Sequence, residues 1–411
     1  MKSTFLIEMQ ERGYLNQCTD LNKLDELASK KSLQAYIGFD CTASSLHVGS
    51  LLQIMILRLL QKHGHRPIVL LGGGTTLIGD PSGKETTRKI LKQKEVKKNI
   101  LSIKKLFTNL LSNKNPKTKP IFVDNFNWLG KLNYIKFLRE IGSQFTLNKM
   151  LTYDSVKTRL EREQSLSYME FNYMILQAYD FYQLHLKKKC DLQLGGSDQW
   201  GNIVNGIDLI RRVTGDTVFG LTSPLITLAS GMKMGKTEKG AVWLNNKLFT
   251  SYDYWQFWRN IDDNDVVKFL QFFTDLSKEK IIKAENQLSI NELKVLLANE
   301  ATKILHGENS SKKAEKIAID TFKLGKLNEN LPTVEISKNI IIKGINIIDL
   351  LVNNKIMSSK NESRRAIKNS GIKINDNTIS NEKRMIELLD FKEKKMKISF
   401  GKKRHYIFKI I

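Results

Sequence analysis

The sequence predicts an α/β fold built on a parallel sheet, followed by an α-helical part and a small α+β part. Three observations lead to this prediction. Strand-like and helical patterns alternate over the first half of the 411 residues, which is typical of a parallel sheet wrapped by helices. After about Leu248 the pattern is mostly helical as far as Leu324. Beyond Pro332 short helices and strands mix and basic residues gather.

The predicted strands of the first half are short apolar runs at 36–40, 67–71, 120–123 and 190–194. Helical spacing of apolar residues predicts helices between and after them. These helices cover 46–63, 84–111, 131–142, 168–187 and 200–213. In an open parallel sheet, ligands bind outside the carboxyl ends of the strands. We therefore expect the functional site in the loops that follow the strands.

The net charge of +24 indicates a polyanionic partner, and nucleic acid is the first expectation. The segment 331–411 carries 18 basic and 8 acidic residues, and 84–119 carries 12 and 2. A bias toward lysine, asparagine and isoleucine that comes from nucleotide composition is the alternative explanation. The uneven distribution of the charge favours a phosphate-bearing partner.

The chain has neither a membrane-spanning nor a secretory pattern. No run of about 20 uninterrupted apolar residues exists, and Glu8 and Glu11 fall where a signal peptide needs an apolar run. The cysteines Cys18, Cys41 and Cys190 are odd in number and lack metal-ligand spacing. We expect reduced thiols and a cytoplasmic protein, or an organellar protein without its transit peptide.

The first candidate site is the turn after the strand at 36–40, where His47-Val48-Gly49-Ser50 begins a helix. Free N–H groups at a helix start favour an anion, and His47 can donate to a phosphate oxygen. Gly49 allows a flat ring to approach the backbone, and Thr42 adds a hydroxyl donor. A surface histidine beside a packing glycine is the simpler interpretation of these residues alone. The sequence has no G-x-x-x-x-G-K-[ST] motif, so a nucleotide site here would be of another type.

Three further loops combine glycine with charged or polar residues. Lys233 and Lys236 lie in a glycine-bounded segment, which suits a mobile loop that folds over phosphates, or a solvated lysine pair. The loop 80–84, DPSGK, follows the second strand, and 194–202, LGGSDQWGN, follows the fourth. The latter suits ribose hydroxyls and a carboxylate. We expect loops that follow strands to open on one edge of the sheet.

The predicted helix at 168–187 carries a polar stripe. Tyr173, Gln177 and Asp180 stand at positions i, i+4 and i+7, which places them on one narrow face. Most neighbouring residues are apolar, and buried polar groups need partners. A solvent-facing stripe is the alternative, but the apolar surroundings favour a stripe that faces a ligand.

These residues together make the chain resemble the bacterial-type tyrosyl-tRNA synthetases, a family of class I aminoacyl-tRNA synthetases. The turn at 47–50, HVGS, is similar to the family's HIGH motif, and 233–237, KMGKT, is similar to its KMSKS motif. GDPSGK, YMILQAYD and GGSDQWGN are more specific to the tyrosine enzyme. ILHGE resembles its helical domain, and 358–375 resembles its S4-like RNA-binding domain. The chain departs from the family at Ser50, in place of the second HIGH histidine, and at Gly235, in place of the KMSKS serine.

The resemblance implies a reaction and a domain plan. The enzyme would activate tyrosine with ATP to tyrosyl-adenylate and pyrophosphate, and would transfer tyrosine to the 3′ end of tRNA(Tyr). Mg²⁺ would accompany ATP, with no bound metal site in the protein, and the enzyme would be a homodimer that does not bind membranes. A Rossmann-like catalytic domain would span 1–230 with a dimer-interface insertion near 125–165. A helical anticodon-binding domain with the KMSKS loop would span 231–330, and an S4-like domain 340–411.

The resemblance also implies roles for single residues. The phenol of tyrosine would bind Tyr36 and Asp180. The ammonium group would bind Tyr173, Gln177 and Asp80, and the carboxylate would bind Gln199. ATP would contact Asp40, His47, Gly49, Ser50, Gly196, Asp198 and Lys236. The triphosphate or its transition state would be held by Thr42, His47, Lys84, Arg88, Lys233 and Lys236.

The predicted C-terminal part contains a basic helix of its own. Ser359 and Glu362 form an S-x-x-E capping-box pattern. RNA-binding candidates on that helix are Arg364, Arg365 and Lys368. A short basic helix beside a strand suits the shape of an RNA backbone, although a solvated basic helix is the alternative.

Two other classes remain open. Tryptophanyl-tRNA synthetase shares the nucleotide motifs, but the pair Tyr36 and Asp180 suits a phenol better. A non-catalytic RNA-binding relative would keep the fold, but the retained lysines and the polar stripe argue against it.

Overall fold

The computed structural model describes the chain except for residues 82–90, 113, 230, 232–233, 238–239, 325–330 and 402–403. The predicted site residues Lys84, Arg88 and Lys233 therefore lie outside the described part. The chain divides into two compact units. Unit 1 comprises Met1–Thr250 and Ile261–Leu305, and unit 2 comprises Ser251–Asn260 and His306–Ile411.

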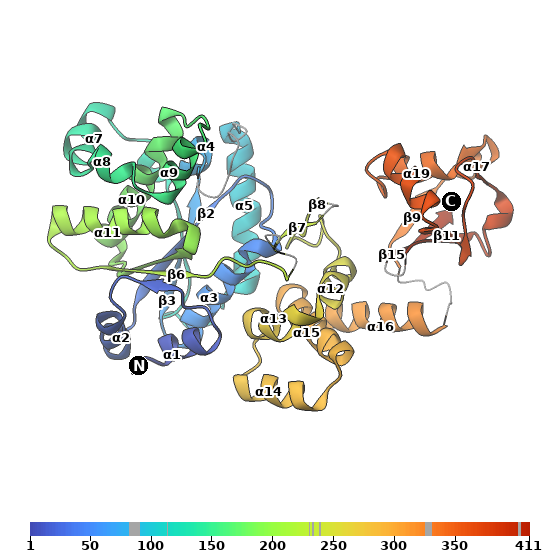
Figure 1. Cartoon of the computed structure of the whole chain (residues 1–411), viewed down its shortest axis with the longest axis horizontal. Helices are drawn as coiled ribbons and strands as arrows, with labels where there is room; N and C mark the ends of the chain where they lie inside the picture. The colour runs from blue at the N-terminus through green and yellow to red at the C-terminus, as the bar shows by residue number, and fades with distance from the viewer. Residues whose placement is uncertain are drawn as a thin grey trace. The chain divides into compact units, whose positions relative to one another are not determined.

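The core of unit 1 is a six-stranded sheet with the order β1-β6-β5-β2-β3-β4 (Figure 1). Neighbouring strands from β6 to β4 run parallel, which confirms the predicted α/β class. The strands are β1 (Gln17–Cys18), β2 (Gln34–Asp40), β3 (Arg66–Gly72), β4 (Ile121–Asp124), β5 (Leu192–Gly196) and β6 (Phe219–Ser223).

The sheet carries one strand that was not predicted, the edge strand β1, which pairs antiparallel with β6. β1 has two residues and no apolar alternation, so no periodic pattern indicates it. β6 is buried along its whole length and was also not predicted. The helix expected at 84–111 is described as α5 (Gln93–Leu110), and the strand expected at 190–194 begins at Leu192.

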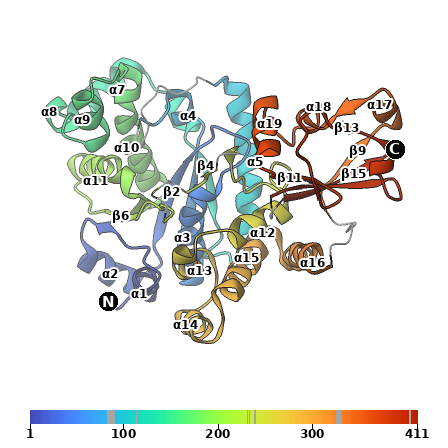
Figure 2. The same ribbon diagram turned by 45° about the vertical axis from the view of Figure 1, so that its right-hand side comes forward.

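Helices cover both faces of the sheet (Figures 1 and 2). The strand β2 shows why, because its successive side chains point to opposite faces. Phe39 packs on Phe107 of α5 with ring centroids 4.8 Å apart. Tyr36, on the other face, packs on Phe181 of α10 (Tyr168–Lys188) at 5.3 Å. α3 (Leu51–Lys62) and α11 (Trp200–Thr214) complete the two layers.

Unit 1 contains further short elements around this core. The helices are α1 (Thr4–Glu11), α2 (Leu21–Lys30), α4 (Thr75–Ile78), α6 (Phe126–Leu129), α7 (Tyr134–Glu140), α8 (Leu147–Met150), α9 (Asp154–Glu161), α13 (Val266–Phe273), α14 (Lys278–Gln287) and α15 (Ile290–His306), whose last residue belongs to unit 2. The strands β7 (Lys236–Thr237) and β8 (Gly240–Ala241) form a small hairpin.

Unit 2 combines two helices with a small α+β region. The helices are α12 (Ser251–Arg259) and α16 (Glu308–Leu324). The second sheet has the order β12-β11-β14-β15-β9, in which β9 runs parallel to β15 and the other pairs are antiparallel. Its strands are β9 (Thr333–Ile336), β11 (Ile372–Ile374), β12 (Asn377–Thr378), β14 (Lys395–Phe400) and β15 (Arg404–Ile410). A second pair joins β10 (Ile345–Asn346) to β13 (Met385–Ile386), and the helices are α17 (Lys338–Ile342), α18 (Ile347–Asn353) and α19 (Lys360–Lys368).

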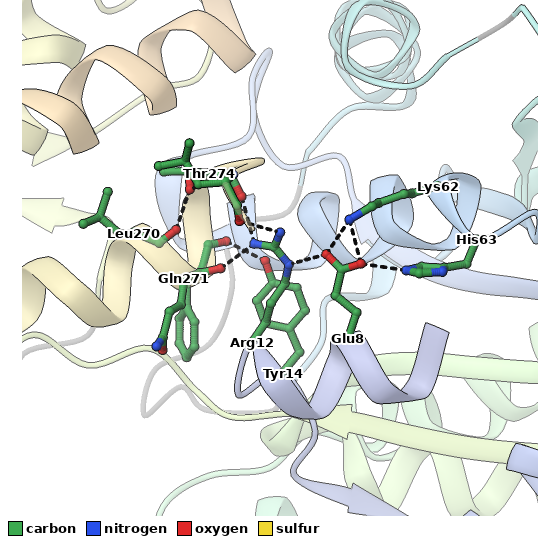
Figure 3. Close-up of polar contacts among 10 residues, drawn as sticks. Glu8, Arg12, Tyr14, Lys62, His63, Leu270, Gln271 and Thr274 are labelled. Carbon is green, nitrogen blue, oxygen red and sulfur yellow. Dashed lines mark hydrogen bonds and ion pairs between the residues drawn. The ribbon is translucent and has the colours of Figure 1, made fainter. Parts of the chain in front are cut away.

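A partly buried ionic cluster, in which Arg12 is buried and Lys62 is exposed, ties the N-terminal helix α1 to α3 and α13 (Figure 3). Arg12 donates to the carbonyls of Gln271, Thr274 and Leu276 at 2.9–3.0 Å. These carbonyls belong to the C-terminal turn of α13 and the residues after it, where a helix leaves its acceptors unpaired. Glu8 accepts from Arg12 and also from Lys62 and His63 of the α3 end. The cluster therefore fixes three separate segments through Glu8 and Arg12.

We expect Glu8→Gln to lower the free energy of unfolding by about 2–3 kcal/mol at pH 7, because it leaves the buried Arg12 without its counter-charge. Burial raises the pKa of Glu8, but hydrogen bonds from Lys62, Arg12 and His63 outweigh burial and lower the pKa from 4.5 to about 2. The stabilisation is thus present above pH 4.5 and is lost as the pH falls toward 2. Thermal unfolding of the wild type and of Glu8→Gln at pH 7 and pH 3 measures the difference in stability at each pH.

Glu11→Gln is the matched control, because Glu11 lies on the same helix but is exposed. The expected order of unfolding midpoints at pH 7 is wild type equal to Glu11→Gln, with Glu8→Gln well below. Equal midpoints for the two variants would show that the cluster does not stabilise the fold.

Candidate active site

A cavity of about 370 Å³ opens at the carboxyl ends of β2 and β5. These two strands are neighbours in the sheet, and the chain order reverses between them, which is where open α/β sheets bind ligands. Most of the predicted site residues line this one cavity. They are Tyr36, Asp40, Thr42, His47, Gly49, Ser50, Asp80, Tyr173, Gln177, Asp180, Gly196, Asp198 and Gln199.

The remaining predicted residues lie elsewhere. Lys84, Arg88 and Lys233 are outside the described residues. The backbone of Lys236 begins the hairpin strand β7, and its side chain is not described. Arg364, Arg365 and Lys368 belong to α19 in unit 2.

One end of the cavity holds the buried carboxyl of Asp180, which is 1% exposed. Its two oxygens accept hydrogen bonds from Asn125 Nδ2 at 2.8 Å and Trp128 Nε1 at 2.7 Å. Burial raises the pKa of Asp180, the bonds from Asn125 and Trp128 lower it, and the result is a pKa of about 7. The carboxyl can therefore exchange a proton near neutral pH, and its position is fixed from both sides.

Two other polar atoms at this end have no hydrogen-bond partner among the described residues. They are the hydroxyl of Tyr36 and Oε1 of Gln193, both buried. Burial, followed by the nearby charge of Asp180, raises the pKa of Tyr36 well above its ordinary value, so the phenol stays protonated. Buried polar groups in proteins are almost always paired. The Asp180 carboxyl, the Tyr36 hydroxyl and Gln193 Oε1 together therefore suit a ligand that brings a hydroxyl group to this end of the cavity.

Three residues of this end were missed from the sequence, namely Asn125, Trp128 and Gln193. Gln193 carried a usable signal, because it is the one amide in the predicted strand 190–194, two residues before Gly195. Asn125 and Trp128 follow the predicted strand 120–123 within a few residues.

A chain of amide and carboxylate groups lines the middle of the cavity. Gln199 Nε2 donates to Asp80 Oδ2 at 3.0 Å. Asn202 Nδ2 donates to Gln177 Oε1 at 3.1 Å and to Gln199 Oε1 at 3.0 Å. The carboxylate of Asp80 beside these amides suits a cationic group such as an ammonium.

Asp40, the last residue of β2, also lines this cavity. Its carboxylate accepts from Thr75 Oγ1 at 3.0 Å and from the hydroxyl of Tyr173 at 3.4 Å. The stripe of Tyr173, Gln177 and Asp180 thus faces the cavity, with Tyr173 and Asp180 buried. The alternative of a solvent-facing stripe does not hold.

At the other end, His47 caps the short helix η1 (Val48–Ser50), and its Nδ1 accepts from the N–H of Gly49 at 3.0 Å. Nδ1 is therefore unprotonated, so a neutral His47 carries its proton on Nε2 and can donate it. The segment 233–237, called the lysine loop below, is followed by residues that hold the His47 turn through backbone hydrogen bonds. Val48 N donates to Val242 O at 2.8 Å, and Leu244 N donates to Leu46 O at 2.9 Å.

Gly49 and Gly235 allow the lysine loop to come close to the His47 turn. A Cβ on Gly49 would lie 2.7 Å from both the carbonyl oxygen of Met234 and the His47 ring. Gly235 has φ +106°, and a Cβ there would lie 2.7 Å from His47 Nδ1. The sequence analysis expected a flat ring to lie close to the backbone of Gly49. In the structure the backbone of Met234 lies close to Gly49 instead. A serine at 235 would be strained in this conformation.

Ser50 lines the cavity at the start of α3, and no capping hydrogen bond from its side chain to that helix forms. It occupies the place of the second histidine of HIGH. Its hydroxyl can donate one hydrogen bond but cannot carry a positive charge.

The N-terminus of the basic helix α19 confirms one half of the predicted capping box. The hydroxyl of Ser359 accepts from Glu362 N at 3.2 Å. The capping box was wrong in its second half, because Glu362 accepts from the N–H and hydroxyl of Ser358, one residue earlier than a capping box requires. Arg364 and Lys368 lie 3.8 and 3.9 Å from Glu382; such exposed pairs are weak and leave both cations accessible.

The described residues contain no group of three or more His, Cys, Asp or Glu side chains that could hold a metal ion. Among the same residues, no helix has the length and apolar character needed to cross a bilayer.

Comparison with known proteins identifies the class. The model of the class I tRNA synthetases for tryptophan and tyrosine (W and Y) matches residues 28–323, and the chain belongs to this family. A second model, the tyrosine--tRNA ligase SYY-like C-terminal domain, matches residues 323–408.

Relatives cover the whole chain. A tyrosine--tRNA ligase of Pelagibacter ubique is 61% identical over 409 residues, which is 99% of each chain. A tyrosine--tRNA ligase of Rickettsia rickettsii is 49% identical over 411 residues, 99% of this chain and all of the relative. Among solved structures, a C-terminally truncated mitochondrial tyrosyl-tRNA synthetase of Coccidioides posadasii is 31% identical with a TM-score of 0.67, over 77% of this chain and 92% of that one. The corresponding protein of Aspergillus nidulans is 27% identical with a TM-score of 0.70, over 78% and 95%.

Proposed function

We propose that this protein is a tyrosine–tRNA ligase that forms tyrosyl-adenylate from tyrosine and ATP and then transfers tyrosine to tRNA(Tyr). One observation carries the choice of tyrosine. The buried end of the cavity presents the carboxyl of Asp180 and the hydroxyl of Tyr36, a pair that suits a phenol. An indole offers a single N–H donor and would leave more of these groups unpaired.

The cavity supports a direct mechanism without a protein nucleophile. Tyrosine would bind with its phenol at Asp180 and its ammonium group near Asp80, Tyr173 and Gln177. Gln199 would orient the carboxylate, whose oxygen attacks the α-phosphate of ATP in line while the bond to pyrophosphate breaks. Catalysis then consists of positioning and of stabilising the charge on the phosphates.

The nucleotide would occupy the His47 end of the cavity. Asp40, Gly196 and Asp198 would contact adenosine, with Gly49 and Ser50 beside it. The donors to the triphosphate would be Thr42, His47, Lys84, Arg88, Lys233 and Lys236. Mg²⁺ would come with ATP and neutralise phosphate charge, bound by phosphate oxygens.

The domain plan stays a proposal of the same kind. We assign catalysis to 1–230, the helical anticodon-binding domain to 231–330 and an S4-like RNA-binding domain to 340–411, with Arg364, Arg365 and Lys368 contacting tRNA. The insertion near 125–165 would form a homodimer. Exposed Tyr134 and Ile135 of α7 and Tyr168 of α10 support this, and sedimentation of an Ile135→Glu variant as a monomer would test it.

Pyrophosphate exchange tests the function. We expect ATP–pyrophosphate exchange to depend on tyrosine and to be far weaker with tryptophan or phenylalanine at equal concentration. Exchange that depends on tryptophan would assign the chain to the other branch of its family. No exchange with any of the three amino acids would indicate a non-catalytic RNA-binding relative.

A further inference from the structure

The segment between β6 and the lysine loop runs beside the candidate active site. β6 ends at Ser223, and Leu225, two residues later, lines the cavity. The backbone of Met234 lies against the His47 turn, since a Cβ on Gly49 would be 2.7 Å from the Met234 carbonyl oxygen. The position of this segment therefore determines where the lysine loop meets the cavity.

Backbone hydrogen bonds join the two ends of this segment. Met234 N donates to Ile226 O at 3.0 Å, and Gly231 N donates to Leu228 O at 2.8 Å. Ile226 and Met234 are both buried. Ala229 is exposed, so no packing of its side chain into the core fixes this part of the segment. A polar contact of the backbone can fix it instead.

That contact is made by the buried carboxylate of Asp265, at the start of α13. Ala229 N donates to Asp265 Oδ2 at 2.8 Å, and Asp265 is 4% exposed. An aspartate at a helix start usually accepts from an N–H group in the first turn of its own helix. Asp265 makes no such capping bond to α13, all of whose residues are described. Its carboxylate binds instead a backbone N–H that lies 36 residues earlier in the chain.

The helix that carries Asp265 is held at both ends. The short helix η4 (Asp263–Asp265) leads into α13, and Asp265 N donates to Asp262 O at 3.1 Å. At the other end of α13, Arg12 binds the carbonyls of Gln271 and Thr274 (Figure 3). Asp265 therefore presents its carboxylate oxygen at a defined place. Hydrogen bonds to charged acceptors are also the stronger kind.

We propose that Asp265 is a positioning residue for adenylate formation, which holds Ala229 and through it places the lysine loop at the phosphates of ATP. The inference rests on the proposed function, in which Lys236 stabilises the charge on the triphosphate. Asp265 is not among the residues that line the cavity, so it contacts neither tyrosine nor the reacting atoms. Its effect should therefore appear in the rate of the chemical step and not in the affinity for tyrosine.

Two variants of the full-length protein test the proposal. Asp265→Ala removes the acceptor of Ala229, whereas Asp265→Asn keeps an acceptor oxygen in the same place. We expect adenylate formation to slow roughly tenfold in Asp265→Ala, because a small misplacement of catalytic groups can cost up to about a hundredfold in rate. It should stay within about threefold of the wild type in Asp265→Asn. The dissociation constant of tyrosine should be unchanged in both. Asp263→Ala, which alters an exposed carboxylate in the same turn, is the matched control and should react at the wild-type rate.

A double-mutant cycle with the lysine loop separates positioning from a general structural effect. In a protein with alanine at both Lys233 and Lys236, Asp265→Ala should slow adenylate formation by less than about twofold, because the cations that it positions are gone. A further tenfold loss in that background would overturn the proposal, since Asp265 would then act independently of the loop. A wild-type rate in Asp265→Ala, or a rate and a tyrosine affinity that fall together, would also overturn it.

Ala229→Pro tests the same hydrogen bond from the other side and decides the matter if Asp265→Ala does not fold. It removes the N–H donor at an exposed position and leaves Asp265 in place. We expect the same loss of roughly tenfold in the rate of adenylate formation, with unchanged tyrosine affinity. A wild-type rate would contradict the proposal. Failure of the proposed function is distinct, because it would abolish tyrosine-dependent pyrophosphate exchange in the wild type and in Asp263→Ala.

Discussion

Asp180→Ala is expected to lower kcat/KM for tyrosine roughly a hundredfold while changing kcat/KM for phenylalanine little. The reason is the loss of a charged acceptor for the phenol, and hydrogen bonds to charged groups are the stronger kind. Pyrophosphate exchange with both amino acids measures the ratio of kcat/KM for tyrosine to kcat/KM for phenylalanine. Asp191→Asn, just before β5 and outside the lining of the cavity, is the control that should leave both values unchanged.

Tyr36→Phe provides a second and cleaner test of the same pocket. The Tyr36 hydroxyl has no hydrogen-bond partner among the described residues, so its removal breaks no bond that holds the fold. We expect a loss of roughly tenfold in kcat/KM for tyrosine and an unchanged unfolding midpoint. An unchanged preference for tyrosine in both Asp180→Ala and Tyr36→Phe would place the phenol elsewhere.

The pKa of Asp180, about 7, sets the direction of a pH effect. In the proposed binding mode the phenol of tyrosine donates a hydrogen bond to the carboxylate form of Asp180, so tyrosine affinity should fall as the pH drops below 7 and Asp180 takes up a proton. Phenylalanine affinity should not follow this curve. For the fold the sign is opposite: between pH 3.8 and 7 the native state binds this proton more tightly than the unfolded chain, so the contribution of Asp180 to stability declines as the pH rises.

Lys236→Ala is expected to slow adenylate formation roughly a hundredfold, about 3 kcal/mol, with little change in tyrosine affinity. Lys236 follows Gly235, whose backbone lies against the His47 turn, so the segment reaches the end of the cavity assigned to the triphosphate. In the proposed function the lysine cation stabilises the phosphate charge of the transition state, so its loss should slow the chemical step rather than weaken tyrosine binding. Pre-steady-state adenylate formation and equilibrium binding of tyrosine separate the two effects.

Lys247→Ala is the matched control for the loop, because Lys247 is an exposed lysine eleven positions later. It should form adenylate at the wild-type rate. A Lys236→Ala variant that is also as fast as the wild type would exclude Lys236 from the phosphate site.

The sequence predicted four of the six strands, β2 to β5, and most of the cavity for one physical reason. Parallel strands end at one edge, so polar residues such as Asp40, Asp80 and Gln199 come together wherever their strands do. The stripe of Tyr173, Gln177 and Asp180 was predictable because helical spacing alone defines a face. The two-residue strand β1 was not, since nothing local distinguishes it and its partner β6 lies some 200 residues away.

The partners of Asp180 were beyond the sequence for a similar reason. Asn125 and Trp128 reach Asp180 across 55 and 52 residues, and neither has a spacing relation to the helix stripe. Gly235 and the His47 turn belong to two motifs that are each local in sequence. The two motifs meet in the fold, where His47 and Trp243 form an isolated antiparallel β-bridge. Patterns of period two or 3.6 describe single elements, so contacts between distant elements require the folded structure.

The bonds of Arg12 to α13 have a consequence for the order in which the chain folds during synthesis. The acceptors of Arg12 lie 259 to 264 residues downstream, so α1 leaves the ribosome long before its partner exists. Contacts of such sequence separation form late, after the loop between them has closed. Until Leu276 has emerged, a growing chain holds a charged Arg12 that lacks its three carbonyl acceptors. The Rossmann-like sheet then assembles with its first helix held to α3 through Glu8 but not yet to α13.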